Sequence, residues 1–180
     1  MSSDSLPAYL IYILYAIILV LSTFAGITAA SKRALDYADR NEIKEMLEDD
    51  PENSKLQAII EFQNKPSKYH YADHLMTYIL SIATFILYNF AVYLTFDLIT
   101  GLQLVIADLV FVILFTAFCD VFPKKLASQD SAKSALHHIG YQRFIYGLTL
   151  PLVHVINWFA NIFLAIGGKS VNVDDSVFFE

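Results

Sequence analysis

The segment from Leu6 to Ala30 contains no charged residue, and it constrains the fold more than any other part of the chain. An α-helix needs roughly 20 consecutive apolar residues to cross the hydrocarbon of a bilayer. A secretory signal would instead begin with basic residues and have a shorter apolar core, whereas Asp4 is the only charged residue before this segment. We therefore predict a retained membrane-spanning helix over residues 6–30.

Two further apolar segments predict two more spans, over residues 72–96 and 99–122, joined by a short turn at Asp97. Over the 180 residues, 56% are hydrophobic, which is typical of a multispan membrane protein and not of an ordinary soluble domain. The predicted fold class is therefore all-α, a polytopic membrane protein with three transmembrane helices in contact with the lipid bilayer.

The charged segment between the first two spans, residues 31–68, mixes acidic and basic side chains. Apolar residues at helical spacing and the helix-ending Pro51 predict two short helices, arranged as a helical hairpin on the membrane surface. All 12 Lys and Arg residues lie either here or between Lys124 and Lys169. Because basic loops stay inside, we expect an outside amino terminus, a cytoplasmic hairpin and a cytoplasmic carboxyl terminus in a cell membrane.

The uncharged segment that follows Arg143 allows two interpretations. It is long enough to cross a bilayer, but it contains Pro151 and His154, and Trp158 suits a membrane interface. We predict an interfacial belt helix over residues 145–166, with a fourth crossing as the alternative. Residues 1–168 then form one transmembrane domain, and residues 169–180 form a cytoplasmic tail.

The segment from Phe111 to Ala127 carries the strongest candidate for chemistry. Asp120 lies inside an apolar run, one turn before Pro123, and a carboxylate there is costly to bury unless it is paired or binds a cation. Pro123 has no N–H, so it frees a carbonyl near residue 119 as a second oxygen ligand. Asp120 is therefore either a cation ligand or an interfacial acid that pairs with Lys124 or Lys125.

A polar stripe on the second span is the other candidate. Its members follow one another at spacings of three or four residues and share one helical face: Asp73, Thr77, Ser81, Thr84 and Tyr88. Such a face must lie against protein or a water-filled cavity. Its hydroxyl groups can ligate a cation or can bond neighbouring helices.

Three motifs, in this order, resemble those of the transmembrane domain of the CNNM/CorC magnesium transporters. They are Phe24-Ala25-Gly26-Ile27-Thr28-Ala29-Ala30, Asp120-Val121-Phe122-Pro123-Lys124, and Pro151-Leu152-Val153 with Asn157 and Asn161. The first resembles a family pattern like FSGSETA, and the second a glutamate-V-x-P-K pattern. The resemblance extends from about Leu6 to Gly168.

This resemblance implies that Mg²⁺ is the bound cation and that Asp120, Thr77 and Ser81 are ligands, with Thr28 adjacent. Ala25 and Thr28 stand where the family has a serine and a glutamate, and the family's cytoplasmic CBS domains have no counterpart in this chain. The chain thus resembles a divergent member of the family.

Two functions of different classes follow. One is a unit that binds or moves a divalent cation between spans two and three, and the other is a non-transporting membrane scaffold or subunit. No pattern of catalytic residues predicts an enzyme, and nothing in the sequence predicts nucleic-acid binding. The spacing of Ser22, Gly26 and Ala30, with the resemblance to a dimeric family, predicts a homodimer or heteromer formed through the spans.

Overall fold

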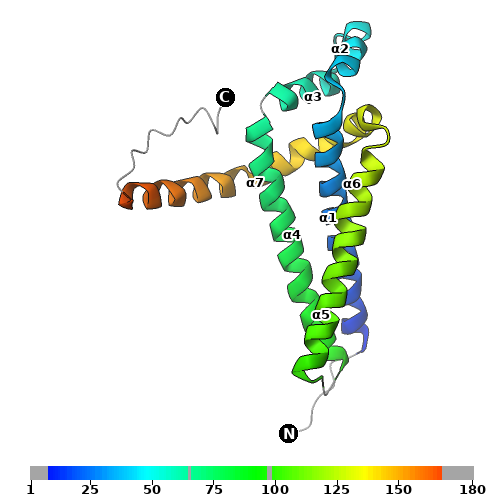
Figure 1. Ribbon diagram of the computed structural model, residues 1–180, viewed down its shortest axis with the longest axis vertical. Helices are drawn as coiled ribbons and strands as arrows, with labels where there is room; N and C mark the ends of the chain where they lie inside the picture. Colours follow the sequence, from blue (N-terminus) through cyan, green and yellow to red (C-terminus); the bar gives the residue numbers. More distant parts are fainter. Residues whose placement is uncertain (1–7, 65, 97–98, 168–180) are drawn as a thin grey trace. The chain divides into compact units, whose positions relative to one another are not determined.

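The computed structural model describes residues 8–64, 66–96 and 99–167, and within these ranges every regular element is helical (Figure 1). In chain order the elements are α1 (Ala8–Tyr37), α2 (Arg40–Asp49), α3 (Ser54–Asn64), α4 (Pro66–Thr95), α5 (Gly101–Phe115), the π-helix η1 (Thr116–Val121), α6 (Phe122–Ala127) and α7 (Ser131–Ile166). The all-α class predicted from the sequence is confirmed.

Four helical stretches are long and apolar enough to cross a bilayer: Tyr9–Tyr37, Tyr71–Thr95, Gly101–Ala127 and Ser131–Phe163. The first three overlap the predicted spans, and the fourth overlaps the predicted belt segment. The protein is therefore a multi-pass membrane protein with several apolar helices, by the length and composition of those helices.

Helix α7 begins earlier than the belt helix that the sequence predicted from residue 145. It starts at Ser131 and continues through Pro151. The prediction placed a boundary where charged residues give way to apolar ones, but a change of polarity does not end a helix. Asp130 caps the start of α7, and its hydrogen bond and ion pair with Lys133 lower the pKa of the Asp130 carboxyl.

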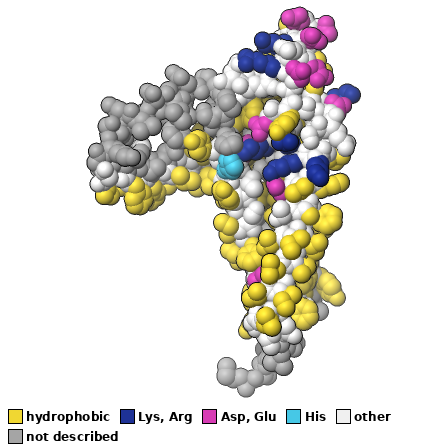
Figure 2. All heavy atoms as spheres, in the orientation of Figure 1, with side chains coloured by type: hydrophobic (Ala, Val, Ile, Leu, Met, Phe, Trp, Pro, Cys, Tyr) yellow, Lys and Arg dark blue, Asp and Glu magenta, His cyan; other side chains and the backbone are white. Residues whose placement is uncertain are grey.

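The chain divides into two compact units. Unit 1 contains residues Met1–Ala30 and Thr77–Lys125, and unit 2 contains Ser31–Met76 and Leu126–Glu180. The apolar side chains that the helices of unit 1 leave exposed are those expected to contact lipid, and Figure 2 shows many of them over α5.

The described helices of unit 1 pack through small residues and a few polar contacts. A Cβ atom at Gly26 would lie 3.4 Å from Pro123 Cγ and 3.8 Å from Cys119 Cα, so the backbone of α1 closely approaches the η1–α6 segment. At the other end of α1, the hydroxyl groups of Tyr15 and Thr95 are 3.1 Å apart. Gly26 thus serves packing within the chain.

Unit 2 has an apolar core built from the two short helices and the ends of the long ones. Its fully buried side chains include Leu35, Ile43, Ile59, Ile139 and Ile145. The rings of Phe62, Tyr69 and Tyr146 form a chain, with centroid separations of 4.9 Å and 5.0 Å. Two short helices, α2 and α3, occupy the segment predicted to form a hairpin, with Pro51 in the turn between them.

A buried polar cluster connects three helices within unit 2. Ser31 Oγ donates to Gln142 Oε1 over 2.9 Å, and Gln142 Nε2 donates to Asp73 Oδ1. All three side chains are buried, and Asp73 Oδ2 has no hydrogen-bond partner among the described residues. Because buried polar groups are costly to leave unpaired, this cluster fixes the local arrangement of its helices.

Candidate functional site

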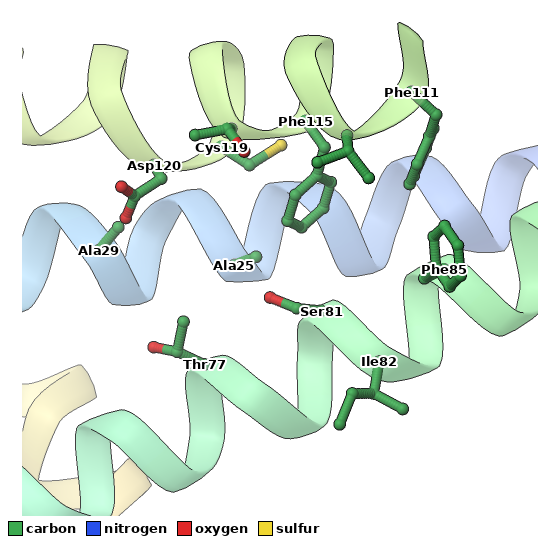
Figure 3. Close-up of a pocket in the computed structure, with 12 residues that line it drawn as sticks. Ala25, Ala29, Thr77, Ser81, Ile82, Phe85, Phe111, Phe115, Cys119 and Asp120 are labelled. Atoms are coloured by element: carbon green, nitrogen blue, oxygen red, sulfur yellow. The ribbon is translucent and has the colours of Figure 1, made fainter. Parts of the chain in front are cut away.

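A cavity of about 440 Å³ lies within unit 1 between three helical segments (Figure 3). Its lining residues are Ala25 and Ala29 of α1, Thr77, Ser81, Ile82 and Phe85 of α4, Phe111, Val112 and Phe115 of α5, and Thr116, Cys119 and Asp120 of η1. In Figure 3 Asp120 lies near Ala29 at one end, and Phe85 and Phe111 lie at the other.

The three residues predicted as cation ligands line this cavity, whereas the adjacent fourth residue of the predicted site does not. Thr77 and Ser81 come from α4, and Asp120 comes from η1. Helical spacing explains the first two, since residues four apart lie on one face. The sequence therefore identified residues from two helices that the fold brings to one cavity.

The fourth predicted residue, Thr28, does not line the cavity. Its side chain is fully buried, and its hydroxyl donates to the Phe24 carbonyl of the same helix over 2.9 Å. Helix α1 instead contributes the methyl groups of Ala25 and Ala29. The α1 wall of the cavity therefore supplies no side-chain oxygen.

The π-helix explains how Asp120 and Thr116 reach the cavity together. The N–H of Phe122 donates to the Ala117 carbonyl, five residues back, as in a π-helix. The next residue, Pro123, has no N–H to give to the Cys119 carbonyl. The sequence predicted a free carbonyl here, but not that the chain would widen into a π-helix, a feature often found at functional sites.

Asp120 forms an ion pair with Lys124. The distance from Lys124 Nζ to Asp120 Oδ1 is 2.6 Å. The Asp120 side chain is 39% exposed, and the Lys124 side chain is 40% exposed. Partly exposed pairs of this kind typically contribute about 0–1 kcal/mol to stability. The pairing with a nearby lysine that the sequence suggested is therefore present, and it involves a side chain that also lines the cavity.

The rest of the polar stripe on α4 has other partners. Thr84 is buried and donates to the Leu80 carbonyl, while the hydroxyl of Tyr88 donates to the Ala107 carbonyl of α5. Asp73 belongs to the cluster in unit 2. The stripe faces protein, as predicted, but only Thr77 and Ser81 in it line the candidate cavity.

The aromatic lining residues and Cys119 were not identified from the sequence. Phe85 lies one helical turn from Ser81 on α4, and Phe111 lies one turn from Phe115 on α5. The four-residue spacing that selected the polar residues could therefore also have selected these aromatic residues. Across the described parts of the chain, no group of three or more His, Cys, Asp or Glu side chains could hold a metal ion. The site therefore offers one carboxylate with hydroxyl groups.

Comparison with known proteins identifies the family but no individual relative. No curated protein matches the chain. Residues 16–178 match the family described as the cyclin M (CNNM) transmembrane N-terminal domain, as the order of the three motifs suggested. Because this match covers most of the chain, the protein belongs to the CNNM transmembrane domain family.

Proposed function

We propose that this protein binds a divalent cation, most simply Mg²⁺, in the cavity of unit 1 and moves it across the membrane. The observation that carries the proposal is that Thr77, Ser81 and Asp120 line one cavity, although they come from two helices. Membership of a family generally associated with divalent-cation transport supports it.

The chemistry of the lining residues suits this cation. Mg²⁺ prefers oxygen ligands, retains several water molecules and is commonly held by only one or two carboxylates. Asp120 supplies the carboxylate, and hydroxyl groups come from Thr77, Ser81 and Thr116. A volume of about 440 Å³ leaves room for a cation with part of its hydration shell.

Lys124 has a defined place in this proposal. Its ammonium group neutralises Asp120 when no cation is bound, because the two groups are in contact at 2.6 Å. A divalent cation would have to displace this ammonium group from the carboxylate. Lys124 is thus a competitor for the cation and not a ligand.

Thermal melting with and without Mg²⁺ tests the proposal. A ligand that binds only the folded state raises the melting temperature, so Mg²⁺ should stabilise the wild type. Asp120→Asn should abolish this stabilisation, whereas Asp120→Glu should retain part of it. Lys124→Gln is the matched control, because it breaks the same ion pair but keeps the carboxylate, and its stabilisation by Mg²⁺ should equal or exceed that of the wild type.

Two results would contradict the proposal. The first is that Mg²⁺ does not stabilise the wild type at any concentration, and the second is that Mg²⁺ stabilises Asp120→Asn as strongly as the wild type. The second result would mean that the cation binds elsewhere. If Mg²⁺ changed the melting temperatures of Asp120→Asn and Lys124→Gln equally, the ion pair with Lys124 would be the only role of Asp120.

A second candidate function is a non-transporting membrane subunit. It is favoured by the α1 wall of the cavity, where Ala25 and Ala29 present methyl groups and Thr28 bonds its own helix. Transport of Mg²⁺ into liposomes that contain the purified protein separates the two functions. Binding without transport would support the subunit.

We also propose the orientation and assembly that the sequence predicts. The amino terminus is outside, the α2–α3 segment and the carboxyl terminus are cytoplasmic, and three helices cross while part of α7 lies at the interface. The segregation of Lys and Arg residues supports this arrangement. A homodimer or heteromer through the spans remains part of the proposal, although Gly26 is occupied by contacts within the chain.

A further inference from the structure

A second cavity lies between α4 and α5 in unit 1. Its volume is about 520 Å³, and its lining includes Tyr88 of α4, Phe96 and Ile99 of the connection that follows α4, and Gln103 and Ala107 of α5. Tyr88 lies one turn beyond Phe85, which lines the candidate cation cavity. The two cavities therefore follow one another along α4 and α5, and the second reaches the α4–α5 turn.

Two stacked aromatic rings connect the linings of the two cavities. Phe111 lines the first cavity and Tyr88 lines the second. Their ring centroids are 3.9 Å apart, and the ring planes differ by only 13°. Phe85 and Phe115 pack around Phe111, with centroids 6.3 Å and 5.7 Å away. Figure 3 shows Phe85 and Phe111 at the end of the first cavity that is remote from Asp120.

A hydrogen bond also fixes the position of Tyr88 in the stack. The Tyr88 hydroxyl donates to the Ala107 carbonyl over 3.0 Å, which connects the ring on α4 to the backbone of α5. In an apolar environment the ring cannot turn away without leaving this hydroxyl unpaired, which is costly. The position of Tyr88 is therefore fixed at both its ring and its hydroxyl group.

A carboxylate lies beside the acceptor of this bond. Asp108 follows Ala107, and its Oδ1 is buried with no hydrogen-bond partner in the described part of the chain. An ionisable group inside a membrane segment commonly marks the path of an ion. Asp108 is not itself among the residues that line the second cavity, but it follows the lining residue Ala107, and no basic side chain lines that cavity.

We propose that the Tyr88–Phe111 stack is a gate between the candidate cation cavity and the second cavity, which leads to the α4–α5 turn. A cation would pass only when the rings separate. The inference rests on the proposed function for the nature of what passes, but the closed barrier itself can be tested without any cation.

Cys119 provides the test, because it is the only cysteine in the chain and it lines the first cavity. A small, positively charged, membrane-impermeant methanethiosulfonate is applied to the full chain in vesicles, separately from each side. Applied from the side of the α4–α5 turn, it should modify wild-type Cys119 slowly. Phe111→Ala should raise this rate about tenfold or more, since a closed barrier opens only as a minor state.

Three further variants make the result specific. Tyr88→Ala removes the other ring and should raise the turn-side rate in the same way, which keeps the test valid if one variant does not fold. Phe118→Ala is the matched control, because Phe118 is 67% exposed and lines neither cavity. Cys119→Ser should give no modification. Folding of each variant is checked by its thermal melting.

The gate is wrong if wild-type Cys119 already reacts from the turn side as fast as Phe111→Ala. It is also wrong if a folded Phe111→Ala or Tyr88→Ala variant reacts no faster than the wild type or Phe118→Ala. Neither result depends on Mg²⁺ binding. Conversely, Mg²⁺ could fail to stabilise the protein while the stack still controlled access to Cys119, so the two proposals fail separately.

Discussion

Replacement of Gly26 measures how closely α1 approaches the η1–α6 segment. In Gly26→Ala the added Cβ would lie 3.4 Å from Pro123 Cγ, at the near edge of ordinary van der Waals contact. Alanine is also about 1 kcal/mol more favourable than glycine within a helix. Gly26→Ala should therefore be as stable as the wild type, or more stable by up to about 1 kcal/mol.

Gly26→Leu should have the opposite effect. The atoms beyond Cβ would enter space held by Pro123 and by the backbone of Cys119, which is 3.8 Å from the Cβ position. Overpacking of this kind typically costs about 1–3 kcal/mol. At roughly 2–4 °C per kcal/mol for a chain of this size, the melting temperature should fall by about 2–12 °C.

Thermal melting in detergent, followed by the loss of helical circular dichroism, measures these changes. Gly147→Leu is the matched control, because no described heavy atom, apart from its own helical neighbourhood, lies within 4 Å of the Cβ position at Gly147. An unchanged melting temperature in Gly26→Leu would refute the close approach of the helices. If the variant instead kept its melting temperature and lost cross-linking between chains, Gly26 would belong to a dimer interface.

Two other predictions address the buried cluster and the orientation. Asp73→Ala should lower stability by about 1–3 kcal/mol in thermal melting, because it leaves Gln142 Nε2 buried without an acceptor, whereas Asp73→Asn retains an oxygen and should lose less. On a Cys119→Ser background, a cysteine replacing Thr100 should react with an impermeant thiol reagent from outside, and one replacing Asn53 should not; the reverse pattern would overturn the orientation. A cysteine replacing Ser170, which lies outside the described residues, should react from outside only if four helices cross.

The helices and part of the candidate site could be predicted because both depend on local periodicity. Uncharged runs identify membrane helices, and four-residue spacing places Thr77 and Ser81 on one helical face. The position of Asp120, one turn before Pro123 and close to two lysines, indicated a candidate site residue. These signals are contained in short segments of sequence, so no knowledge of the tertiary structure was needed.

The features that the sequence did not predict depend on tertiary contacts. Asp73 and Thr77 follow one another on the same stripe, yet Asp73 bonds to Gln142, a residue far along the chain. Thr28 occupies a motif position, but the rotation of α1 turns Ala25 and Ala29 toward the cavity. Helical spacing gives the face of one helix, but it does not specify which helix that face will meet.

The two sequence interpretations of Asp120 are compatible in the folded chain. Its carboxylate contacts Lys124 one turn away and also lines a cavity with two hydroxyl groups of α4. If Lys124 only anchored the helix at the membrane interface, the carboxylate of Asp120 would not need to line the cavity. A carboxylate that only bound a cation would be left without a counter-charge after the cation departed, which is costly in an apolar setting. A neighbouring ammonium group removes that cost, and it can do so reversibly because both side chains remain partly exposed. The ion pair is therefore consistent with the proposed cation site, which would have to hold and then release its cation.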